Sequence, residues 1–482
     1  MDTGRRLRAG ALLRLFGNWR PGRGDIVSSI QGHITQLVCD GRLPFGTHLP
    51  SERDLARELG VSRTTVAAVY DRLRASGHVE TRQGAGSWVS RGHAEGSEAA
   101  APWYPVGTHA EIDLTQAALP APTELLADLL ARAAPAACRY GEGHGYFLYG
   151  LPELRAAIAR RYTDRGVPTT AGQILVTTGA QNALALSLAT TLRPGSRVLV
   201  EHPTYPNALA AIRRFGGNCV PVDLEPAGWD FERWRVAVRE ARPDLIYCVP
   251  DCHNPTGLIM PEDCRAGLVD IARHAGAALL IDETLTDLTL DEPSPVPLSR
   301  FARDGMLQVS IGSLSKIFWG GLRVGWMRGP EPFIARAAAV KATLDMATPV
   351  VDQVLACYVL ADLDTIALPR RAQLRANRAA MLSILATSMP SWQTAMPSGG
   401  ISAWVRLGAP VATRLSEVSR KCGVLITPGP LFGIDGSFED YIRLPLTLTN
   451  EMLAEAMQRL IQAWAALRDT RVVEPPSLVG TV

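Results

Sequence analysis

The spacing of hydrophobic positions changes along the chain and predicts two kinds of structural unit. Near the N-terminus, residues 25–40 place apolar side chains at helical spacing, which predicts an amphipathic helix; these side chains are Ile26, Ile30, Ile34 and Leu37. Further along, helical stretches alternate with short apolar runs, namely Ile174–Val176, Val198–Val200, Leu245–Val249, Ala278–Ile281 and Leu307–Ile311. That alternation is typical of an α/β domain built on a mostly parallel sheet.

A stretch of small and polar residues divides the chain. At 482 residues the chain is too long for a single compact core. Residues 93–110 are rich in Ala, Gly, Glu and Ser and predict a linker. It separates an expected domain at 1–92 from a larger one at 111–482. Within the latter we expect a large lobe at about 165–335 and a smaller α+β lobe at about 340–470.

Charge is distributed unevenly between these parts. Residues 1–92 contain 14 arginines, no lysine and eight acidic residues, a net charge of +6. Because the whole chain carries +2, the remainder carries −4. A basic module on a mildly acidic body indicates a nucleic-acid binder joined to a sensor or enzyme. We interpret the arginines before the first helix, among them Arg5 and Arg6, as a basic arm or leading helix.

Cysteine spacing and hydropathy narrow the class of protein further. The eight cysteines form no CxxC pair and show no zinc-ligand spacing, which favours reduced thiols and no metal site. No apolar run reaches the length of a membrane span. We therefore expect a cytoplasmic protein.

Residues 51–90 carry the pattern of a winged helix-turn-helix. Ser51 and Asp54 match a capping box for one helix, Gly60 ends it, and Ser62 caps the next. The first turn of that second helix is left exposed, where recognition helices reach base edges; its residues are Arg63, Thr64 and Thr65. His78–Arg82 and Ser87–Ser90 flank Gln83-Gly84-Ala85-Gly86, which predicts a β-hairpin wing.

The stretch from Leu49 to Val89 closely resembles the winged helix of GntR-type repressors. The resemblance implies binding to a double-stranded DNA operator through Arg53, Arg63, Thr65 and Gly86. A winged helix used only for protein contacts is the alternative, and the positive charge of the segment argues against it.

Lysine is rare in this chain, and that rarity points to a cofactor. Pyridoxal 5′-phosphate (PLP) is held as a Schiff base to a lysine amine. The chain has only Lys316, Lys341 and Lys421, and we expect the last two to be solvated surface groups. Lys316 instead follows an apolar run and lies among groups that suit a phosphate anchor; these are Ser313, Ser315 and Arg323.

Further candidate ligands follow the other predicted strands, at the edge where open parallel sheets bind ligands. Gly179-Ala180-Gln181 opens a helix whose free N–H groups suit a phosphate. Tyr205 suits stacking on a pyridine ring, and Asn254 suits a hydrogen bond to the ring hydroxyl. A buried Asp282 would keep the pyridine nitrogen protonated.

This set resembles the fold-type I aminotransferases over about 300 residues. The resemblance implies that Lys316 forms the Schiff base, Asp282 pairs with the pyridinium, Asn254 holds the ring hydroxyl and Arg323 binds the phosphate. The arginine that binds the substrate carboxylate falls on Arg443, whose planar fork suits a bidentate contact.

A GntR-type winged helix followed by an aminotransferase-like domain is the architecture of the MocR/GabR-type regulators, which the chain resembles over nearly its whole length. The resemblance implies a homodimer whose PLP site senses an amine or amino acid. Those regulators carry a Tyr two residues after the pyridinium partner, and Thr284 stands there in this chain. Another phenol, or Asn254 alone, must then hold the ring hydroxyl.

The residues predict a PLP-dependent transcriptional regulator. Two other functions use the same residues. One is a working transaminase that its winged helix only tethers to DNA. The other is a regulator whose site senses PLP itself. We expect transamination to be slow or absent, because a fused DNA-binding module gives the ligand-bound state a use without turnover.

Overall fold

The computed structural model describes residues 7–16, 26–39, 43, 47–75, 79–82, 86–89, 111–291, 293–434 and 436–469. It divides the chain into two compact units. One unit comprises Met1–Thr108 with Asp435–Ser437, and the other comprises His109–Ile434 with Phe438–Val482. The predicted linker 93–110, the arginines Arg5 and Arg6, and most of the predicted wing tip (83–85) lie outside the described residues.

The first unit contains four helices and a hairpin within its described residues: α1 (Ala9–Phe16), α2 (Ile26–Cys39), α3 (Glu52–Leu59), α4 (Arg63–Ala75), β1 (Val79–Arg82) and β2 (Gly86–Val89). Ser51 caps α3 by accepting a hydrogen bond from the Asp54 amide at 3.1 Å, as the capping pattern predicts. Gly60 ends α3 with a left-handed φ of 68°. The strands β1 and β2 pair antiparallel, with Arg82 opposite Gly86.

The core of this unit forms where the apolar faces of α2, α3 and α4 meet. Ile30 and Ile34 of the predicted N-terminal face are fully buried, together with Val66 and Val69 of α4. Ile26 is the exception, because it begins α2 and is exposed. The hydrophobic periodicity of residues 25–40 is therefore confirmed except at its first position.

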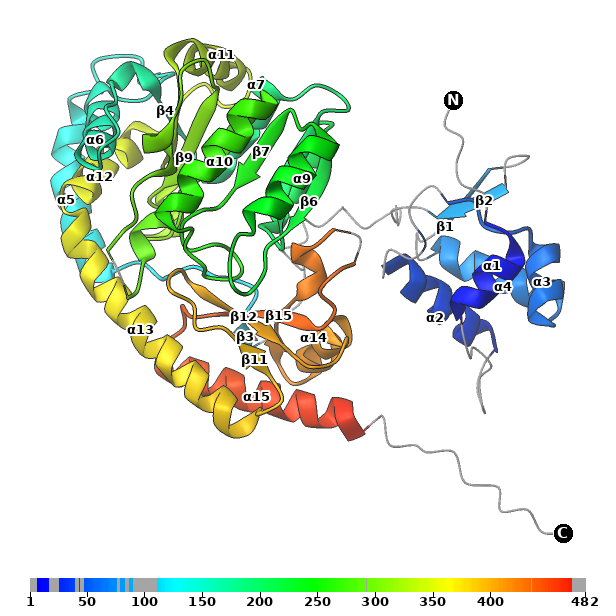
Figure 1. The fold of residues 1–482 in the computed structure, drawn as a ribbon. Helices are drawn as coiled ribbons and strands as arrows, with labels where there is room; N and C mark the ends of the chain where they lie inside the picture. Colours follow the sequence, from blue (N-terminus) through cyan, green and yellow to red (C-terminus); the bar gives the residue numbers. More distant parts are fainter. Residues whose placement is uncertain are drawn as a thin grey trace, which may run out of the picture. The chain divides into compact units, whose positions relative to one another are not determined.

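The second unit is organised around a seven-stranded sheet of order β4-β10-β9-β8-β7-β5-β6 (Figure 1). Its strands are β4 (Ile174–Thr177), β5 (Arg197–His202), β6 (Asn218–Asp223), β7 (Leu245–Cys248), β8 (Ala278–Asp282), β9 (Gln308–Ser313) and β10 (Gly325–Arg328). Strand β10 runs antiparallel to both of its neighbours, and the remaining pairs are parallel. The predicted α/β fold with a mostly parallel sheet is confirmed.

Helices cover both faces of this sheet, which explains why its strands appear as continuous apolar runs. Val198 and Val200 pack on one side with α7 (Ala180–Thr191), α8 (Pro206–Arg214) and α11 (Glu331–Ala342). Leu199 lies on the opposite side with α9 (Phe231–Ala241) and α10 (Glu262–Ala275).

Two strands of the sheet have no counterpart among the predicted runs. Strand β6 is one of the two edge strands and is only partly buried, and an edge position tolerates Pro221. Strand β10 is short, and its sequence Gly-Trp-Met-Arg has no apolar run. The apolar pattern therefore found the strands whose residues are nearly all buried, including β4 at the other edge of the sheet, and missed β6 and β10.

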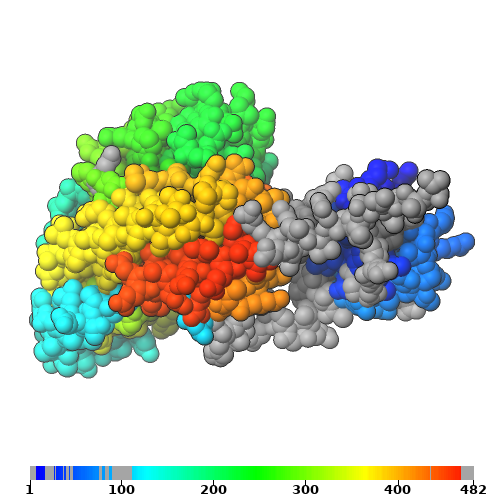
Figure 2. Space-filling view, turned by 90° about the horizontal axis from the view of Figure 1, so that it is seen from below, coloured from blue at the N-terminus to red at the C-terminus, as the bar shows by residue number. Residues whose placement is uncertain are grey.

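The second unit also contains a smaller, four-stranded sheet of order β11-β12-β15-β14. Its strands are β11 (Gln393–Thr394), β12 (Ser402–Arg406), β14 (Thr427–Pro428) and β15 (Tyr441–Pro445), and β3 (Ile112–Asp113) pairs separately with β13 (Val424–Leu425). Helices α14 (Ala412–Lys421) and α15 (Asn450–Asp469) pack beside these strands, and α13 (Leu363–Ser388) packs on α15. Helices α5 (Thr123–Cys138), α6 (Pro152–Asp164) and α12 (Val350–Ala361) instead form a group in which α6 contacts β4 of the large sheet. Figure 2 shows α13 in yellow and α15 in red-orange lying against one another. Short 3-10 turns occur at Ala171–Gln173, Thr286–Leu288, Leu298–Phe301, Gly320–Leu322 and Gly429–Phe432.

Two further features of the described residues bear on function. No helix among them combines the length and the apolar character that a membrane span requires. Nor do they contain three or more His, Cys, Asp or Glu side chains grouped so as to hold a metal ion.

Candidate cofactor site and DNA-binding surface

The predicted cofactor residues lie at one edge of the large sheet. They follow β4, β5, β7, β8 and β9, whose pairings make these five strands run in the same direction. The carboxyl ends of parallel strands meet at one edge, where open α/β sheets bind ligands.

Lys316 lies in the turn after β9, and its amine has an unusual electrostatic environment. Its Nζ donates to the backbone oxygen of Ala117 at 2.9 Å. Burial lowers the pKa of this amine to about 8, and the positive charges of Arg443 and Arg323 act in the same direction. Asp282 opposes them. A pKa near 8 leaves part of the amine neutral near pH 7, and the neutral amine is the nucleophile.

Asp282 ends β8 and is held by hydrogen bonds from two directions. The phenol of Tyr247, on the adjacent strand β7, donates to its Oδ2 at 3.0 Å. The amide of Thr284 donates to Oδ1 at 3.0 Å, and the Thr284 hydroxyl donates to the same oxygen. Burial raises the pKa of Asp282, whereas these hydrogen bonds and the charge of Lys316 lower it.

Tyr247 was not among the predicted site residues. Tyr247 lies inside the apolar run Leu245–Val249. A buried tyrosine hydroxyl needs a hydrogen-bond partner, and that requirement was the signal in the sequence that could have identified it. The structure also shows what Thr284 does in place of the usual tyrosine, because its hydroxyl bonds to Asp282. Both hydroxyls therefore hold Asp282.

The start of α7 and the Arg323 side chain form the part of the site suited to a phosphate. Gly179 precedes α7 with a φ of 83°, and Ala180 is its first residue. Arg323 donates from Nη2 to the Thr178 oxygen at 3.0 Å. A Cβ at position 179 would lie 2.5 Å from that Nη2 atom, so glycine is required for this approach. Gly325 packs equally closely, because its Cβ would lie 2.7 Å from the Ala180 amide nitrogen.

The two serines near Lys316 differ from the prediction in what they contact. Ser313 is buried, and its hydroxyl donates to the Val324 oxygen at 3.0 Å and lies 2.9 Å from the Ser315 hydroxyl. The Ser315 amide donates to Ser313 Oγ at 3.1 Å. In this structure Ser313 therefore closes its own turn, and Ser315 is the more accessible of the two.

Tyr205 and Asn254 follow β5 and β7 at the same end of the sheet. The Tyr205 phenol lies 3.3 Å from Gln181 Oε1 and accepts from Asn207 at 3.0 Å, so it meets the start of α7. The Oδ1 atom of Asn254 is buried and has no hydrogen-bond partner among the described residues. A buried amide oxygen without a partner is rare and indicates a missing ligand or water.

Arg443 comes from the small sheet but reaches the same region. It is buried on β15, where it donates to Thr115 O and, at 3.2 Å, to Thr427 Oγ1. Burial lowers its pKa to about 9, and the nearby Tyr205 and Asp113 side chains act in the opposite direction. Arg443 in turn lowers the pKa of Lys316, so the fold brings together residues that lie far apart in the sequence.

The donor set fits PLP at each of its functional groups. Lys316 offers an amine for the aldehyde, Asp282 a carboxylate for the ring nitrogen, and Asn254 a side-chain amide for the ring hydroxyl, whose Oδ1 has no partner among the described residues. The start of α7 and Arg323 offer N–H groups and a positive charge for the phosphate.

One prediction about the lysines is wrong. Lys341 is fully buried, and its Nζ pairs with Asp345. Lys341 lies on the same buried face of α11 as Ile334, Ala337 and Ala338, so the helix directs its side chain inward. Lys421 is exposed at the end of α14, as expected.

The predicted DNA contacts lie on the surface of the first unit. Arg53, Arg63, Thr64 and Gly86 are exposed, and Thr65 is partly exposed. Ser62 caps α4 through the Thr65 amide at 3.0 Å, and its hydroxyl also contacts the Thr64 and Thr65 hydroxyls. Arg63 forms an ion pair with Glu52 at 3.3 Å. Because an exposed ion pair contributes little to stability, Arg63 can leave Glu52 to bind another partner.

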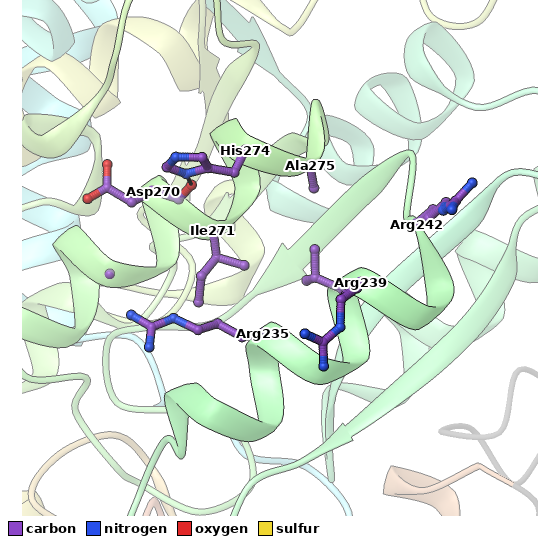
Figure 3. Close-up of a pocket in the computed structure, with 9 residues that line it drawn as sticks. Arg235, Arg239, Arg242, Asp270, Ile271, His274 and Ala275 are labelled. Carbon is purple, nitrogen blue, oxygen red and sulfur yellow. Dashed lines mark hydrogen bonds between the residues drawn. The ribbon is translucent and has the colours of Figure 1, made fainter.

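The second unit also has an open basic groove of about 690 Å³ between α9 and α10 (Figure 3). Arg235, Arg239 and Arg242 line it opposite His274 and Asp270. It shares no residue with the predicted cofactor set. Arginines near helix C-termini also complement the helix dipole, so the groove by itself indicates no ligand.

Comparisons with known proteins agree with this geometry. The model of the family described as "Aminotransferase class I and II" matches residues 77–460. The model described as "Bacterial regulatory proteins, gntR family" matches residues 26–89. The first match covers most of the chain, and the second covers the winged helix.

Similar proteins include regulators and aminotransferases. The HTH-type transcriptional regulator TauR of Rhodobacter capsulatus is 27% identical over 85% of this chain and 90% of its own. The probable rhizopine catabolism regulatory protein MocR of Rhizobium meliloti is 29% identical over 61% of this chain and 63% of its own.

A solved structure shares the fold of the second unit. It is LysN, the α-aminoadipate aminotransferase of Thermus thermophilus, complexed with N-(5′-phosphopyridoxyl)-L-leucine. The identity is 27% and the TM-score 0.68, over 74% of this chain and 93% of LysN. The chain thus belongs to the aminotransferase class I and II family and, with its gntR-type winged helix, is a PLP-dependent transcriptional regulator of the MocR/GabR type.

Proposed function

We propose that this regulator holds PLP covalently on Lys316 and senses an amine or amino acid that displaces this lysine. The observation that carries the proposal is the Lys316 amine, which has a pKa of about 8 and is influenced by Asp282, Arg323 and Arg443. Bound PLP supplies an aldehyde that exchanges one amine for another. An amine with this pKa is a good nucleophile near neutral pH and also a good leaving group for the exchange.

Each remaining residue has a role that follows from its contacts. Asp282, fixed by Tyr247 and Thr284, keeps the ring nitrogen protonated. Asn254 donates to the ring hydroxyl and Tyr205 stacks on the ring. The phosphate is held by N–H donors and one hydroxyl, from Gly179, Ala180, Gln181, Ser315 and Arg323, whereas the Ser313 hydroxyl is occupied within its own turn.

Arg443 restricts the class of effector. A buried guanidinium, whose pKa burial lowers to about 9, remains charged at neutral pH and gains from a carboxylate partner that offsets the buried charge. An effector that meets Lys316 with its amine and Arg443 with a carboxylate is an amino acid. We therefore propose an amino acid as the effector in preference to a simple amine or to PLP itself.

The winged helix supplies the output. We propose that Arg53, Arg63, Thr64, Thr65 and Gly86 contact a double-stranded operator, with the first turn of α4 at the base edges. The matching family consists of bacterial regulatory proteins, so we place the protein in the cytoplasm of a bacterial cell, where the chromosome lies. An effector changes transcription only if it binds two arrangements of the protein with different affinity. The test is whether an amino acid that changes the cofactor absorbance also changes the affinity for DNA.

We further propose that the protein is a homodimer in which a second copy covers the edge of the cofactor site. Leu344 and Met346 are exposed in the loop after α11, with Leu344 at 62%. Asp345 of this loop accepts from Thr178 at 3.1 Å, so the loop adjoins the start of the phosphate site. Exposed apolar side chains that adjoin a functional site mark an interaction surface.

Replacing Leu344 and Met346 together with aspartate is expected to weaken dimerisation by about 100-fold, because two apolar anchors become charged. Sedimentation at micromolar concentration should then give the mass of one chain, whereas the wild type gives twice that mass. Leu368→Asp is the matched control, since Leu368 is 64% exposed but lies on α13. A monomeric wild type, or a monomer produced by Leu368→Asp alone, contradicts the proposed interface.

A further inference from the structure

Two fully buried ionisable side chains lie beside the proposed cofactor site without belonging to its set of contacts. Glu201 is near the end of β5, and His253 directly precedes Asn254 in the turn after β7. Neither side chain is exposed, and His253 Nε2 lies 3.3 Å from Glu201 Oε2. A buried carboxylate and a buried imidazole each need polar partners to offset the loss of water.

The other contacts of Glu201 keep it an acceptor. Its Oε1 accepts from the Trp229 indole at 2.8 Å, and its Oε2 accepts from the Val249 amide at 2.8 Å. Both Glu201 oxygens therefore act as hydrogen-bond acceptors. At 3.3 Å the approach of His253 is electrostatic rather than a well-aligned hydrogen bond.

The imidazole of His253 links this carboxylate to the turn that carries Asn254. Its Nδ1 lies 2.9 Å from the Thr256 hydroxyl. Because both Glu201 oxygens act as acceptors, we assign the ring hydrogen to Nε2, and Nδ1 then accepts from the Thr256 hydroxyl. The backbone closes the same turn, since His253 N donates to Leu258 O at 2.8 Å and Gly257 N donates to His253 O at 2.6 Å.

The opposite side of the turn is closed by tight packing. A Cβ at Gly257 would lie 2.4 Å from the Cβ of Pro397 and 2.9 Å from the Gly399 oxygen. The turn is therefore packed on one side against the segment that contains these residues. On its other side the polar contacts of His253 and Thr256 determine its position.

We infer that Glu201 and His253 are positioning residues that fix Asn254 for the ring hydroxyl of PLP, an inference that rests on the proposed cofactor site. The tyrosine usual at position 284 is absent, and the hydroxyls of Thr284 and Tyr247 bond to Asp282 instead. Asn254 then carries the contact with the ring hydroxyl. A hydrogen bond weakens steeply with a shift of a few tenths of an ångström, so its supporting residues matter.

Two substitutions test this inference in the full-length protein. His253→Leu removes both polar contacts of the ring, and Thr256→Val removes only the hydroxyl that meets Nδ1. We expect PLP to bind the apo-protein about tenfold more weakly in the first variant and about threefold more weakly in the second, the range of one hydrogen bond lost or loosened. An amide that donates to the ring oxygen draws negative charge away from the lysine-bound nitrogen. Loosening it should therefore raise the midpoint pH of the cofactor's spectral titration in both variants.

Thr289→Val is the matched control, because the Thr289 hydroxyl is buried and has no hydrogen-bond partner among the described residues. It should leave PLP affinity and the titration midpoint unchanged. If His253→Leu and Thr256→Val lower only the melting temperature, the pair is merely structural and the inference is wrong. Should His253→Leu fail to fold, Thr256→Val decides by the same two readouts. A wild-type protein that takes up no PLP contradicts the proposed function, and this inference with it.

Discussion

Lys316→Ala is expected to abolish covalent attachment of PLP. The wild-type protein should be yellow, and borohydride should trap the cofactor on a peptide that contains Lys316. The chain has only two other lysines, and Lys421 is exposed at the end of α14. Lys421→Ala is therefore a matched control that should retain the full adduct. An adduct that persists in Lys316→Ala, or that maps to Lys341, contradicts the assignment.

The same reaction has a defined pH dependence. The folded pKa of Lys316 is depressed to about 8, so the reactive neutral amine increases as the pH rises toward that value. Attachment to the apo-protein should accelerate about tenfold per pH unit below pH 7 and level off above pH 8 to 9. A rate that continues to rise through pH 10 would indicate an ordinary solvated lysine.

Removing residues 1–92 is expected to abolish specific DNA binding while PLP uptake persists. Specific binding is about 10³-fold or more tighter than non-specific binding. A loss of this size can be measured as a change in affinity for DNA fragments whose binding sites footprinting has identified. Within the full chain, Arg63→Ala should cost about 1–3 kcal/mol and relax sequence preference if the contact is bidentate.

Arg57→Ala is the matched control for Arg63. Arg57 is exposed on α3 and pairs with Asp54 at 2.6 Å, an exposed ion pair that contributes little. It should change affinity less than Arg63→Ala and leave sequence preference intact. Unchanged DNA binding by the truncated protein would overturn the assignment of the DNA-binding domain.

Local sequence signals predicted the features that depend on neighbours in the chain. The capping of α3 by Ser51, the glycine that ends it and the strands covered on both faces follow from such signals. The position of Asp282 at the end of β8 also follows, because an apolar run stops there. These elements are set by helix capping and by alternation of side chains along a buried strand.

The features that escaped prediction depend on how elements pack in space. Lys341 was expected on the surface, but α11 turns it inward, where Asp345, four residues further on, pairs with it. Tyr247 meets Asp282 only because β7 and β8 are neighbours in the sheet. Glu201 and His253 are brought together by the pairing of β5 with β7. Sheet order, which the apolar pattern does not encode, decides each of the last two contacts.

The same reasoning applies to the effector. Arg443 was a candidate from a short motif alone, and the fold places it near Tyr205 and where it lowers the pKa of Lys316. That placement changes a generic amine sensor into a proposed amino-acid sensor. Binding an amino acid is not the same as converting it. Turnover also needs proton transfer and product release, beyond the binding that these residues provide.

The most direct test is to measure DNA affinity and transamination side by side, across a panel of amino acids and 2-oxo acids, in wild type and Lys316→Ala. We predict that at least one amino acid shifts the cofactor absorbance and changes DNA affinity by about 5- to 150-fold in the wild type, with no such effect in Lys316→Ala. Turnover of about 1–10 s⁻¹ without any ligand effect on DNA affinity would contradict the account and show a tethered enzyme.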